Sequence, residues 1–188
     1  EEFLQGEEMS FFIISDGKSF KIFETAQDHK RVGEGDIGKN TGGMGAYSPS
    51  LLINPNLQKK IINKIIQPTL KSLNKIGCSY KGFLYVGLMI DEHNDPYVVE
   101  FNVRFGDPEC QITIPLISSD LGELLNAASN DKLSEISVEF HSKHALTVVL
   151  AAENYPGPVE KGRLIQNLPK PTFEKHAQYA LRGGVRIH

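Results

Sequence analysis

The sequence predicts an α+β fold in which an antiparallel β-sheet is flanked by helices. Two β-rich runs, residues 10–15 and 19–23, lie on either side of Asp16-Gly17, a dipeptide typical of hairpin turns. Residues 54–76 carry Leu and Ile at helical spacing. Residues 82–90 are an almost continuous apolar run, as expected of a strand buried on both faces. Each pattern has an apolar face that only packing against another element can bury.

Length and composition restrict the class of protein. The chain has 188 residues, of which 40% are hydrophobic and 23% are charged, enough for a core and for one or two domains. Its net charge of −3 does not indicate the basic surface that nucleic-acid binding needs. The longest apolar run, Phe83 to Ile90, is too short to cross a bilayer, so we expect no membrane association. Cys78 and Cys110 form neither a disulfide framework nor a metal-ligand spacing, and a cytoplasmic location suits them best.

A Gly-rich segment follows the predicted hairpin, reading G-E-G-D-I-G-K-N-T-G-G-M-G-A-Y-S-P over residues 33–49. Gly33, Gly35 and Gly38 spell G-x-G-x-x-G, but no strand runs directly into them and no helix opens from them. We therefore reject a dinucleotide-binding fingerprint, and the missing G-K-[ST] excludes a Walker A loop. A loop with this much Gly lets the backbone approach a ligand closely, although a plain surface loop has the same composition.

The helix predicted over Asn54–Ile76 has its own start and stop signals. Asn54 is a plausible N-cap with Pro55 after it, and Gly77 suits the position after the last turn. Pro68 must kink the helix or split it in two, because its nitrogen carries no hydrogen. We assign no chemistry to the apolar stripe, which consists of Leu57, Ile61, Ile62, Ile65, Ile66, Leu70 and Leu73.

The later elements follow from similar patterns. Residues 93–96, His-Asn-Asp-Pro, predict a turn into the next strand. Asp120–Asn130 predicts a second helix, whose opening D-L-G-E resembles a capping box. Ala145–Ala152 predicts another buried strand, followed by a turn at Tyr155-Pro156-Gly157.

The candidate chemistry is concentrated in residues 98–109, which read V-V-E-F-N-V-R-F-G-D-P-E. Side chains alternate faces along a strand, so Glu100, Asn102 and Arg104 share one face. A carboxylate and an amide oxygen two residues apart can share one Mg²⁺, and an arginine can hold an anion beside it. The alternative is a plain amphipathic strand with a polar outer face. In either case we expect the opposite face in the core: Val99, Phe101, Val103 and Phe105.

The segment R-F-G-D-P-E-C-Q, residues 104–111, resembles the signature of the phosphoribosylamine–glycine ligase family, ATP-grasp enzymes of purine biosynthesis. Three other segments are similar to the same family: E-E-F-L-Q-G-E-E at the start, Q-D-H-K-R at 27–31 and N-T-G-G-M-G-A-Y-S-P at 40–49. The resemblance covers roughly residues 1–170. It implies an ATP-grasp domain over residues 1–140, and the start of a small β-rich C-terminal domain over residues 141–188.

The resemblance also implies a nucleotide site. Residues 1–4 would receive the adenine, Glu8 the ribose hydroxyls, and Arg31 with Asn40 the ATP phosphates. The cofactor-binding residues are thus expected to be Glu1, Glu2, Phe3, Leu4, Glu8, Arg31 and Asn40.

A metal and catalytic set is implied in the same way. Glu100 and Asn102 would hold Mg²⁺ or Mn²⁺ on the phosphates. Arg104 would meet the transferring phosphoryl group or the glycine carboxylate. Asp107 and Glu109 are candidates to orient an amine, and no feature of the sequence decides between them.

The implied reaction joins glycine to 5-phosphoribosylamine. Glycine attacks the γ-phosphate of ATP to give glycyl phosphate, and the amine then displaces phosphate, giving glycinamide ribonucleotide, ADP and phosphate. Two alternatives stay open: another ATP-grasp carboxylate–amine ligase, and a non-catalytic module that binds a divalent ion or a partner. Only the last predicts no nucleotide binding. We expect a monomer with small-molecule substrates.

The two ends of the chain depart from the family pattern. The sequence starts without a Met and inside patterned sequence, so we interpret it as a fragment that lacks an N-terminal part and most of the C-terminal domain. Near the other end, His176-Ala177 and Gly183–Ile187 lie closer together than the corresponding family segments. The family's phosphate-clamping lobe is not present, so we expect this chain alone to be inactive.

Overall fold

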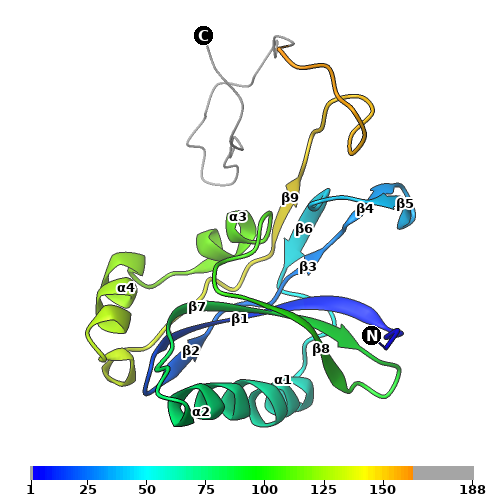
Figure 1. Ribbon diagram of the computed structural model, residues 1–188. Coiled ribbons are helices and arrows are strands. Elements are labelled where there is room, and N and C mark those ends of the chain that lie inside the picture. Colours follow the sequence, from blue (N-terminus) through cyan, green and yellow to red (C-terminus); the bar gives the residue numbers. More distant parts are fainter. Residues whose placement is uncertain (1, 163–188) are drawn as a thin grey trace. The chain divides into compact units, whose positions relative to one another are not determined.

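A four-stranded antiparallel sheet with the order β2-β1-β7-β8 is the centre of the computed structural model, which describes residues 2–162 (Figure 1). The first hairpin consists of β1 (Glu7–Asp16) and β2 (Phe20–Ile22), as predicted. β7 (Lys81–Ile90) pairs with β1 along its whole length and is buried between β1 and β8 (Pro96–Asn102). The predicted α+β architecture is therefore confirmed, and so is the buried strand at residues 82–90.

The Gly-rich segment is mostly paired, which corrects the loop prediction. β4 (Arg31–Gly33) and β5 (Ile37–Asn40) form a two-stranded hairpin with left-handed backbone at Gly35, where φ is +74°. The chain then enters β6 (Gly45–Ser48). β4 does run into Gly33, contrary to the expectation, but the G-x-G-x-x-G leads into β5 and not into a helix, which agrees with the rejected dinucleotide fingerprint.

A second, three-stranded sheet has the order β3-β6-β9. Its outer strands are β3 (Gln27–Asp28) and β9 (Ala145–Val148). The prediction of a buried strand over Ala145–Ala152 is wrong in length and in burial. β9 ends at Val148, and the side chains of Leu146 and Val148 are exposed because they alternate with the half-buried positions.

The long helix covers one face of the large sheet and is interrupted by a π turn. It consists of α1 (Pro55–Ile61), the π segment η1 (Ile62–Ile66) and α2 (Gln67–Lys75). The predicted N-cap is confirmed, since Asn54 Oδ1 accepts a hydrogen bond from Leu57 N at 2.9 Å. At the other end, Gly77 has φ +78°, and Cys78 N donates to Leu73 O.

The π turn is how this helix accommodates Pro68. Pro68 has no N–H to donate to the carbonyl four residues earlier, and its ring crowds that carbonyl. In the widened turn, Gln67 N instead donates to Ile62 O, five residues back. The predicted interruption is therefore present, but it lies in the turn before the proline.

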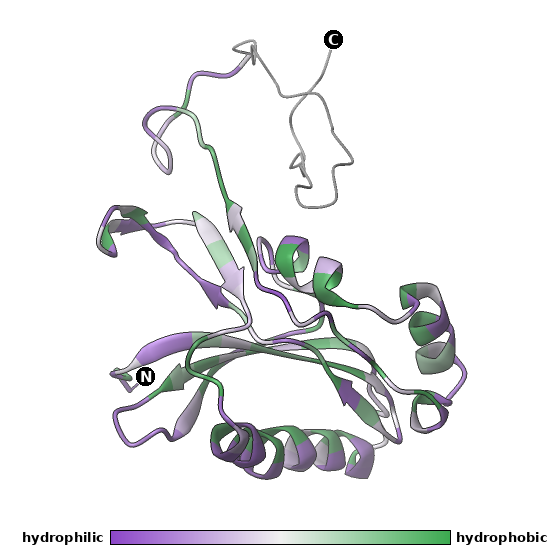
Figure 2. Cartoon of the chain, turned by 180° about the vertical axis from the view of Figure 1, so that it is seen from behind, coloured by the Kyte–Doolittle hydropathy of each residue, from purple (hydrophilic) through white to green (hydrophobic). Residues whose placement is uncertain are grey.

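The core forms two layers, one on each face of the large sheet (Figure 2). The face toward the long helix buries alternate residues of β1 and β7, including Phe11, Ile13 and Val86. The opposite face buries Phe12 and Ile14 under α3 (Cys110–Thr113), α4 (Leu121–Ser129) and the short turns η2 (Ile114–Leu116) and η3 (Leu133–Glu135). The predicted second helix is confirmed as α4, which Asp120 caps by accepting from Glu123 N at 2.8 Å.

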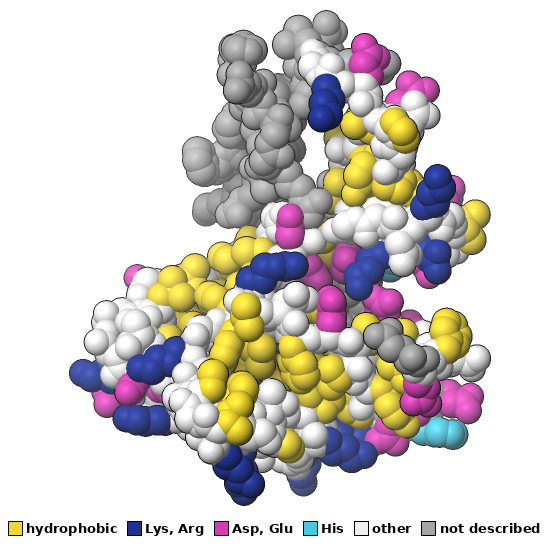
Figure 3. Space-filling model, in the orientation of Figure 1, with side chains coloured by type: hydrophobic (Ala, Val, Ile, Leu, Met, Phe, Trp, Pro, Cys, Tyr) yellow, Lys and Arg dark blue, Asp and Glu magenta, His cyan; other side chains and the backbone are white. Residues whose placement is uncertain are grey.

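The apolar side of β8 is exposed, contrary to the prediction. Val99, Phe101 and Val103 are 48%, 43% and 75% exposed, and apolar side chains gather on this side of the molecule over β8 and the long helix (Figure 3). β8 is an edge strand, so one of its sides has no neighbouring strand. A bulge also interrupts the alternation, because Leu88 pairs with Val98 and Gly87 with Glu100, leaving Val99 between them. Phe105 alone follows the prediction and packs on Phe83.

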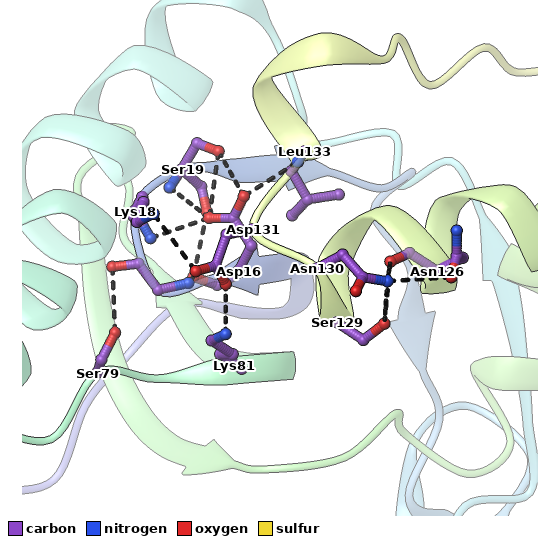
Figure 4. Close-up of polar contacts among 12 residues, drawn as sticks. Asp16, Lys18, Ser19, Ser79, Lys81, Asn126, Ser129, Asn130, Asp131 and Leu133 are labelled. Atoms are coloured by element: carbon purple, nitrogen blue, oxygen red, sulfur yellow. Dashed lines mark hydrogen bonds and ion pairs between the residues drawn. The ribbon is translucent and has the colours of Figure 1, made fainter.

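The Asp16 side chain connects the first hairpin by a hydrogen bond to Leu133, which is far along the chain (Figure 4). Its buried carboxylate accepts hydrogen bonds from Lys18 N at 2.9 Å, Ser19 N at 2.7 Å and Leu133 N at 3.0 Å. Burial alone would raise the pKa of Asp16, but these hydrogen bonds outweigh burial and hold the pKa below its ordinary value. Asp131 lies beside this group and forms exposed ion pairs with Lys18 and Lys81.

The chain divides into two compact units, residues 1–150 and 151–188. In the described part of the second unit, a turn brings Gly157 N to Asn154 O at 2.7 Å, where the sequence predicts a turn at Tyr155-Pro156-Gly157. The segments expected to depart from the family pattern, His176-Ala177 and Gly183–Ile187, lie outside the described residues. The domain boundary expected after residue 140 stays a prediction. Among the described residues, none of the helices combines the length and apolar character needed to cross a bilayer.

Candidate active site

A polar cavity of about 130 Å³ lies over one face of the large sheet. Its floor comes from β7 and β8, and its walls come from β3, from the segment between β5 and β6, and from the turn of residues 104–109, called the site turn below. The lining residues are Asp28, Lys30, Thr41, Gly42, Tyr85, Glu100, Asn102, Arg104, Gly106, Asp107 and Glu109. The structure therefore brings all five predicted metal and catalytic residues around one space.

Strand register places Glu100 and Asn102 on the cavity floor. Glu100 pairs with Gly87, and Asn102 pairs with Tyr85, so these side chains share one face of the sheet. A Cβ atom at Gly87 would lie 3.2 Å from both Glu100 Cγ and Tyr85 Oη. Glycine at this position therefore leaves room for the two larger side chains beside it.

The Glu100 and Asn102 side chains fit a divalent cation that is also held by phosphates. They are in contact, with Asn102 Nδ2 donating to Glu100 Oε1 at 2.9 Å, so both oxygen-bearing groups face the same space. Within the part of the chain that the structure describes, no cluster of three or more His, Cys, Asp or Glu could hold a metal alone. Mg²⁺ commonly takes one or two protein oxygens and completes its shell with substrate phosphates and water.

A smaller cavity of about 10 Å³ adjoins the larger one and shares Asp28, Lys30, Tyr85 and Glu100 with it. Glu8 lines this smaller space, where its Oε2 is 2.9 Å from Lys30 Nζ. Burial by itself would lower the pKa of Lys30, but the hydrogen bond and the charge of Glu8 outweigh burial and raise the pKa. Lys30 therefore places a lasting positive charge between the two cavities.

The two acidic residues of the site turn lie in different environments. Asp107 is exposed and accepts a hydrogen bond from Gln111 Nε2 at 2.8 Å. Glu109 is 3% exposed and accepts one from Ser10 Oγ at 2.9 Å. Arg104, also exposed, donates from Nη1 to Phe105 O at 2.8 Å. Burial first, and then the charges of Asp107 and Glu109, raise the pKa of the Cys110 thiol, which agrees with a packing role rather than a nucleophilic one.

The predicted nucleotide-binding residues are only partly assembled. Glu8 lies at the smaller cavity, whereas the lining of the two cavities does not include residues 2–4, and Glu1 lies outside the described residues. Arg31 and Asn40 face each other across the β4–β5 hairpin. Arg31 donates to Gly38 O at 2.8 Å and lines a separate open pocket between this hairpin and β9. Their contacts with ATP therefore stay predictions.

Sequence reasoning missed Ser10, Tyr85 and Gly87, which lie inside apolar strands. A serine or tyrosine in such a run is normally interpreted as part of the core. The one available signal was the spacing of Tyr85 and Gly87, which puts a hydroxyl and a gap on the same strand face. Lys30 could be found through its place in Q-D-H-K-R, although that segment did not reveal the contact with Glu8.

We expect Gly43→Ala to be more destabilising than Gly35→Ala, although both glycines have left-handed φ angles, +108° and +74°. A Cβ atom at Gly43 would lie 2.6 Å from Pro108 Cδ and 2.7 Å from Asp28 Oδ1, whereas one at Gly35 meets nothing within 4 Å. The shared backbone strain costs about 1–2 kcal/mol, and the collision at Gly43 should add about 1–3 kcal/mol. Thermal melts of both variants measure the difference; equal midpoints would contradict the close contact of Gly43 with the site turn.

Comparison with solved structures supports the fold assignment. A crystal structure of phosphoribosylamine–glycine ligase from Thermotoga maritima matches 89% of this chain and 42% of that chain, with 37% identity and a TM-score of 0.70. The biotin carboxylase domain of a thermophilic 2-oxoglutarate carboxylase matches 78% of this chain at 16% identity and a TM-score of 0.54, which shows similarity of fold alone. The architecture is that of the ATP-grasp class, as predicted.

The sequence comparisons identify the family. The model of the phosphoribosylglycinamide synthetase, ATP-grasp (A) domain, matches residues 1–110, and the chain belongs to this family. Phosphoribosylamine–glycine ligase of Brucella melitensis is 49% identical over 170 residues, covering 90% of this chain and 40% of that relative. The chloroplastic enzyme of Arabidopsis thaliana is 50% identical over 169 residues, covering 89% of this chain and 32% of that relative. The chain thus spans less than half the length of these relatives.

Proposed function

We propose that the protein to which this chain belongs ligates glycine to 5-phosphoribosylamine with ATP, a step of purine biosynthesis. The observation that carries the proposal is the single cavity lined by the family-motif residues Glu100, Asn102, Arg104 and Asp107. The relatives named phosphoribosylamine–glycine ligase support the choice of substrates. We expect a monomer acting in the cytoplasm, although the Arabidopsis relative is named as chloroplastic.

The reaction needs positioning and charge neutralisation rather than a protein nucleophile. A carboxylate oxygen of glycine attacks the γ-phosphorus, the bond to the bridging oxygen breaks, and ADP leaves. The amine nitrogen of phosphoribosylamine then attacks the carbonyl carbon, phosphate leaves, and the nitrogen loses a proton. Arg104 is the group to hold the transferring phosphoryl or the glycine carboxylate. Asp107, an exposed carboxylate at the cavity wall, is the group to orient the amine.

Metal and nucleotide would bind on the cavity floor and beside Glu8. Glu100 and Asn102 would hold Mg²⁺ or Mn²⁺, which supplies neutralisation of phosphate charge when it is bound. Lys30 would add a positive charge beside the phosphates. Oε2 of Glu8 pairs with Lys30, and Oε1 of Glu8 would take the ribose hydroxyls. Residues 1–4 would receive the adenine, and Arg31 with Asn40 would contact the phosphates.

We expect MgADP to raise the melting midpoint of this chain. At a ligand concentration 100 times the dissociation constant, mass action adds about 2.7 kcal/mol of stability, which corresponds to roughly 5–10 °C for a protein of this size. Differential scanning fluorimetry with MgADP, with Mg²⁺ alone and with inorganic phosphate measures the effect. An unchanged midpoint with MgADP would favour a non-catalytic module.

Product analysis on the full gene product then tests the substrates. Glycinamide ribonucleotide should form only when glycine, phosphoribosylamine and ATP are all present. Ligation of another amino acid in preference to glycine would overturn the proposed substrates while keeping the ATP-grasp chemistry.

A further inference from the structure

Ser10 and Glu109 form a buried polar contact between the sheet and the site turn. Both residues are 3% exposed, and Ser10 Oγ donates to Glu109 Oε1 at 2.9 Å, although the residues are 99 positions apart in the sequence. Ser10 lies on β1 opposite Gly87, in the same row as Glu100 on β8. The contact therefore connects the cavity floor directly to the turn that carries Arg104 and Asp107.

Tyr85 lies within reach of the same Ser10 hydroxyl. Its Oη lies 3.4 Å from Ser10 Oγ, and it lines both cavities. Burial raises the pKa of Tyr85 to about 12, so the phenol keeps its proton over the working pH range. A serine hydroxyl has a single proton. That proton goes to Glu109 over the shorter distance, and the longer contact with Tyr85 places the Ser10 hydroxyl between the cavity floor and the site turn.

Glu109 is held from the other sides by the backbone. A Cβ atom at Gly106 would lie only 2.3 Å from Glu109 Oε2, so the carboxylate packs directly against the start of its own turn. The carbonyl of Glu109 accepts hydrogen bonds from both N and Oγ1 of Thr113, each at 2.9 Å. Side chain and main chain of Glu109 are thus fixed together, whereas Asp107 stays exposed to the cavity.

We propose that Ser10 is a positioning residue: by holding Glu109, it fixes the site turn so that Arg104 and Asp107 face the substrates. This inference rests on the proposed function and divides the two acidic residues between two roles. Asp107 reaches the substrate, and Glu109 is the buried anchor of the turn. The competing interpretation is that Ser10 only satisfies a buried carboxylate and that the turn would keep its place without it.

Ser15 provides a matched control for Ser10. It is also a buried serine of β1, and its hydroxyl donates to Ser19 O at 3.2 Å, at the hairpin end of the strand away from the cavity lining. In the full gene product, Ser10→Ala should lower kcat about 10- to 100-fold, as expected of a misplaced reacting group, with little change in the KM for ATP. Ser15→Ala should leave kcat unchanged, although both variants remove a buried hydroxyl that donates a hydrogen bond.

A second pair of variants separates the anchoring role of Glu109 from the substrate-contacting role of Asp107. Glu109→Gln keeps an oxygen that accepts from Ser10, so it should retain most of kcat, whereas Asp107→Asn should lose most of it. Equal losses for these two variants would overturn the division of roles. A kcat of Ser10→Ala within twofold of the wild type, or an equal loss for Ser15→Ala, would overturn the positioning role.

Hydrogen exchange in this 188-residue chain gives a readout that does not depend on activity. Ser10→Ala should speed exchange of the backbone amides of Cys110, Gln111, Ile112 and Thr113, which donate to carbonyls of the site turn, and Ser15→Ala should leave these amides protected. If the wild-type gene product shows no ligase activity, the proposed function fails, and the exchange result alone decides the positioning role. Unchanged exchange in Ser10→Ala would refute it.

Discussion

Glu100→Gln should slow the proposed ligation by about 10²–10³-fold while leaving the folded state as stable as the wild type. The substitution keeps the shape of the side chain but removes the negative charge that would face a divalent cation in the proposed site. Glu100 is exposed on an edge strand and contacts Asn102 within the cavity, so it contributes little to the core. The loss should therefore appear in the rate and in its dependence on Mg²⁺, and the melting midpoint should stay the same.

Rate against Mg²⁺ concentration, with the melting midpoint alongside, is the measurement in the full gene product. Glu92→Gln is the matched control, because it removes the same charge from a highly exposed residue between β7 and β8 that lines neither cavity. Wild-type activity and Mg²⁺ dependence in Glu100→Gln would show that β8 is only an amphipathic strand. A loss of similar size in Glu92→Gln would show a general effect of net charge.

Asp16→Asn should destabilise the protein by roughly 2–3 kcal/mol, because an amide cannot accept every hydrogen bond that the buried carboxylate accepts. If the amide oxygen of the variant still accepts hydrogen bonds from Lys18 N and Ser19 N, its NH₂ group must face Leu133 N. Two hydrogen-bond donors then lie against each other. For a chain of this size, the melting midpoint should fall by about 5–10 °C. Asp131→Asn is the control within the same group of side chains, since Asp131 makes only exposed ion pairs with Lys18 and Lys81 among the contacts described, and its midpoint should barely change (Figure 4).

The pH dependence of the Asp16 effect follows from its lowered pKa. A carboxyl whose folded-state pKa lies below the unfolded value of about 3.9 contributes full stability above that pH. The contribution is lost as the pH falls through the folded pKa. The difference between wild type and Asp16→Asn should therefore be constant from neutral pH down to about pH 5 and shrink in stronger acid. A difference that stays the same in acid would show that the charge of Asp16 is not what Leu133 N requires.

Local patterns predicted the elements of the fold well, because each had a physical cause within a few residues. The N-cap at Asn54, the glycine at position 77 and the hairpin at Asp16-Gly17 all appear where the sequence placed them. The position of β8 could not be predicted in this way. Alternation shows that a strand has two faces, but whether the apolar one is covered depends on strand order, which is set by distant pairing. The exposed Val103 is the result.

Alternation along one strand correctly placed Glu100, Asn102 and Arg104 around one space, because these residues are close in sequence. The rest of that space was missed where the cavity brings distant strands together. Ser10 has no polar neighbour pattern that points to Glu109, and nothing in Q-D-H-K-R pairs Lys30 with Glu8. The proposed division of roles between Asp107 and Glu109 depends on burial, a property of packing that two acids in one turn do not reveal.

The order of the strands also has a consequence for how the chain folds. The two central strands, β1 and β7, pair from Asp16 with Lys81 to Glu7 with Ile90, so a long loop must close before the sheet exists. The last partner of Asp16, Leu133, is 117 positions away. Such non-local pairing slows folding. During synthesis β1 and β2 are made before β7, so the edge of β1 that pairs with β7 stays open to association with other chains until β7 has left the ribosome.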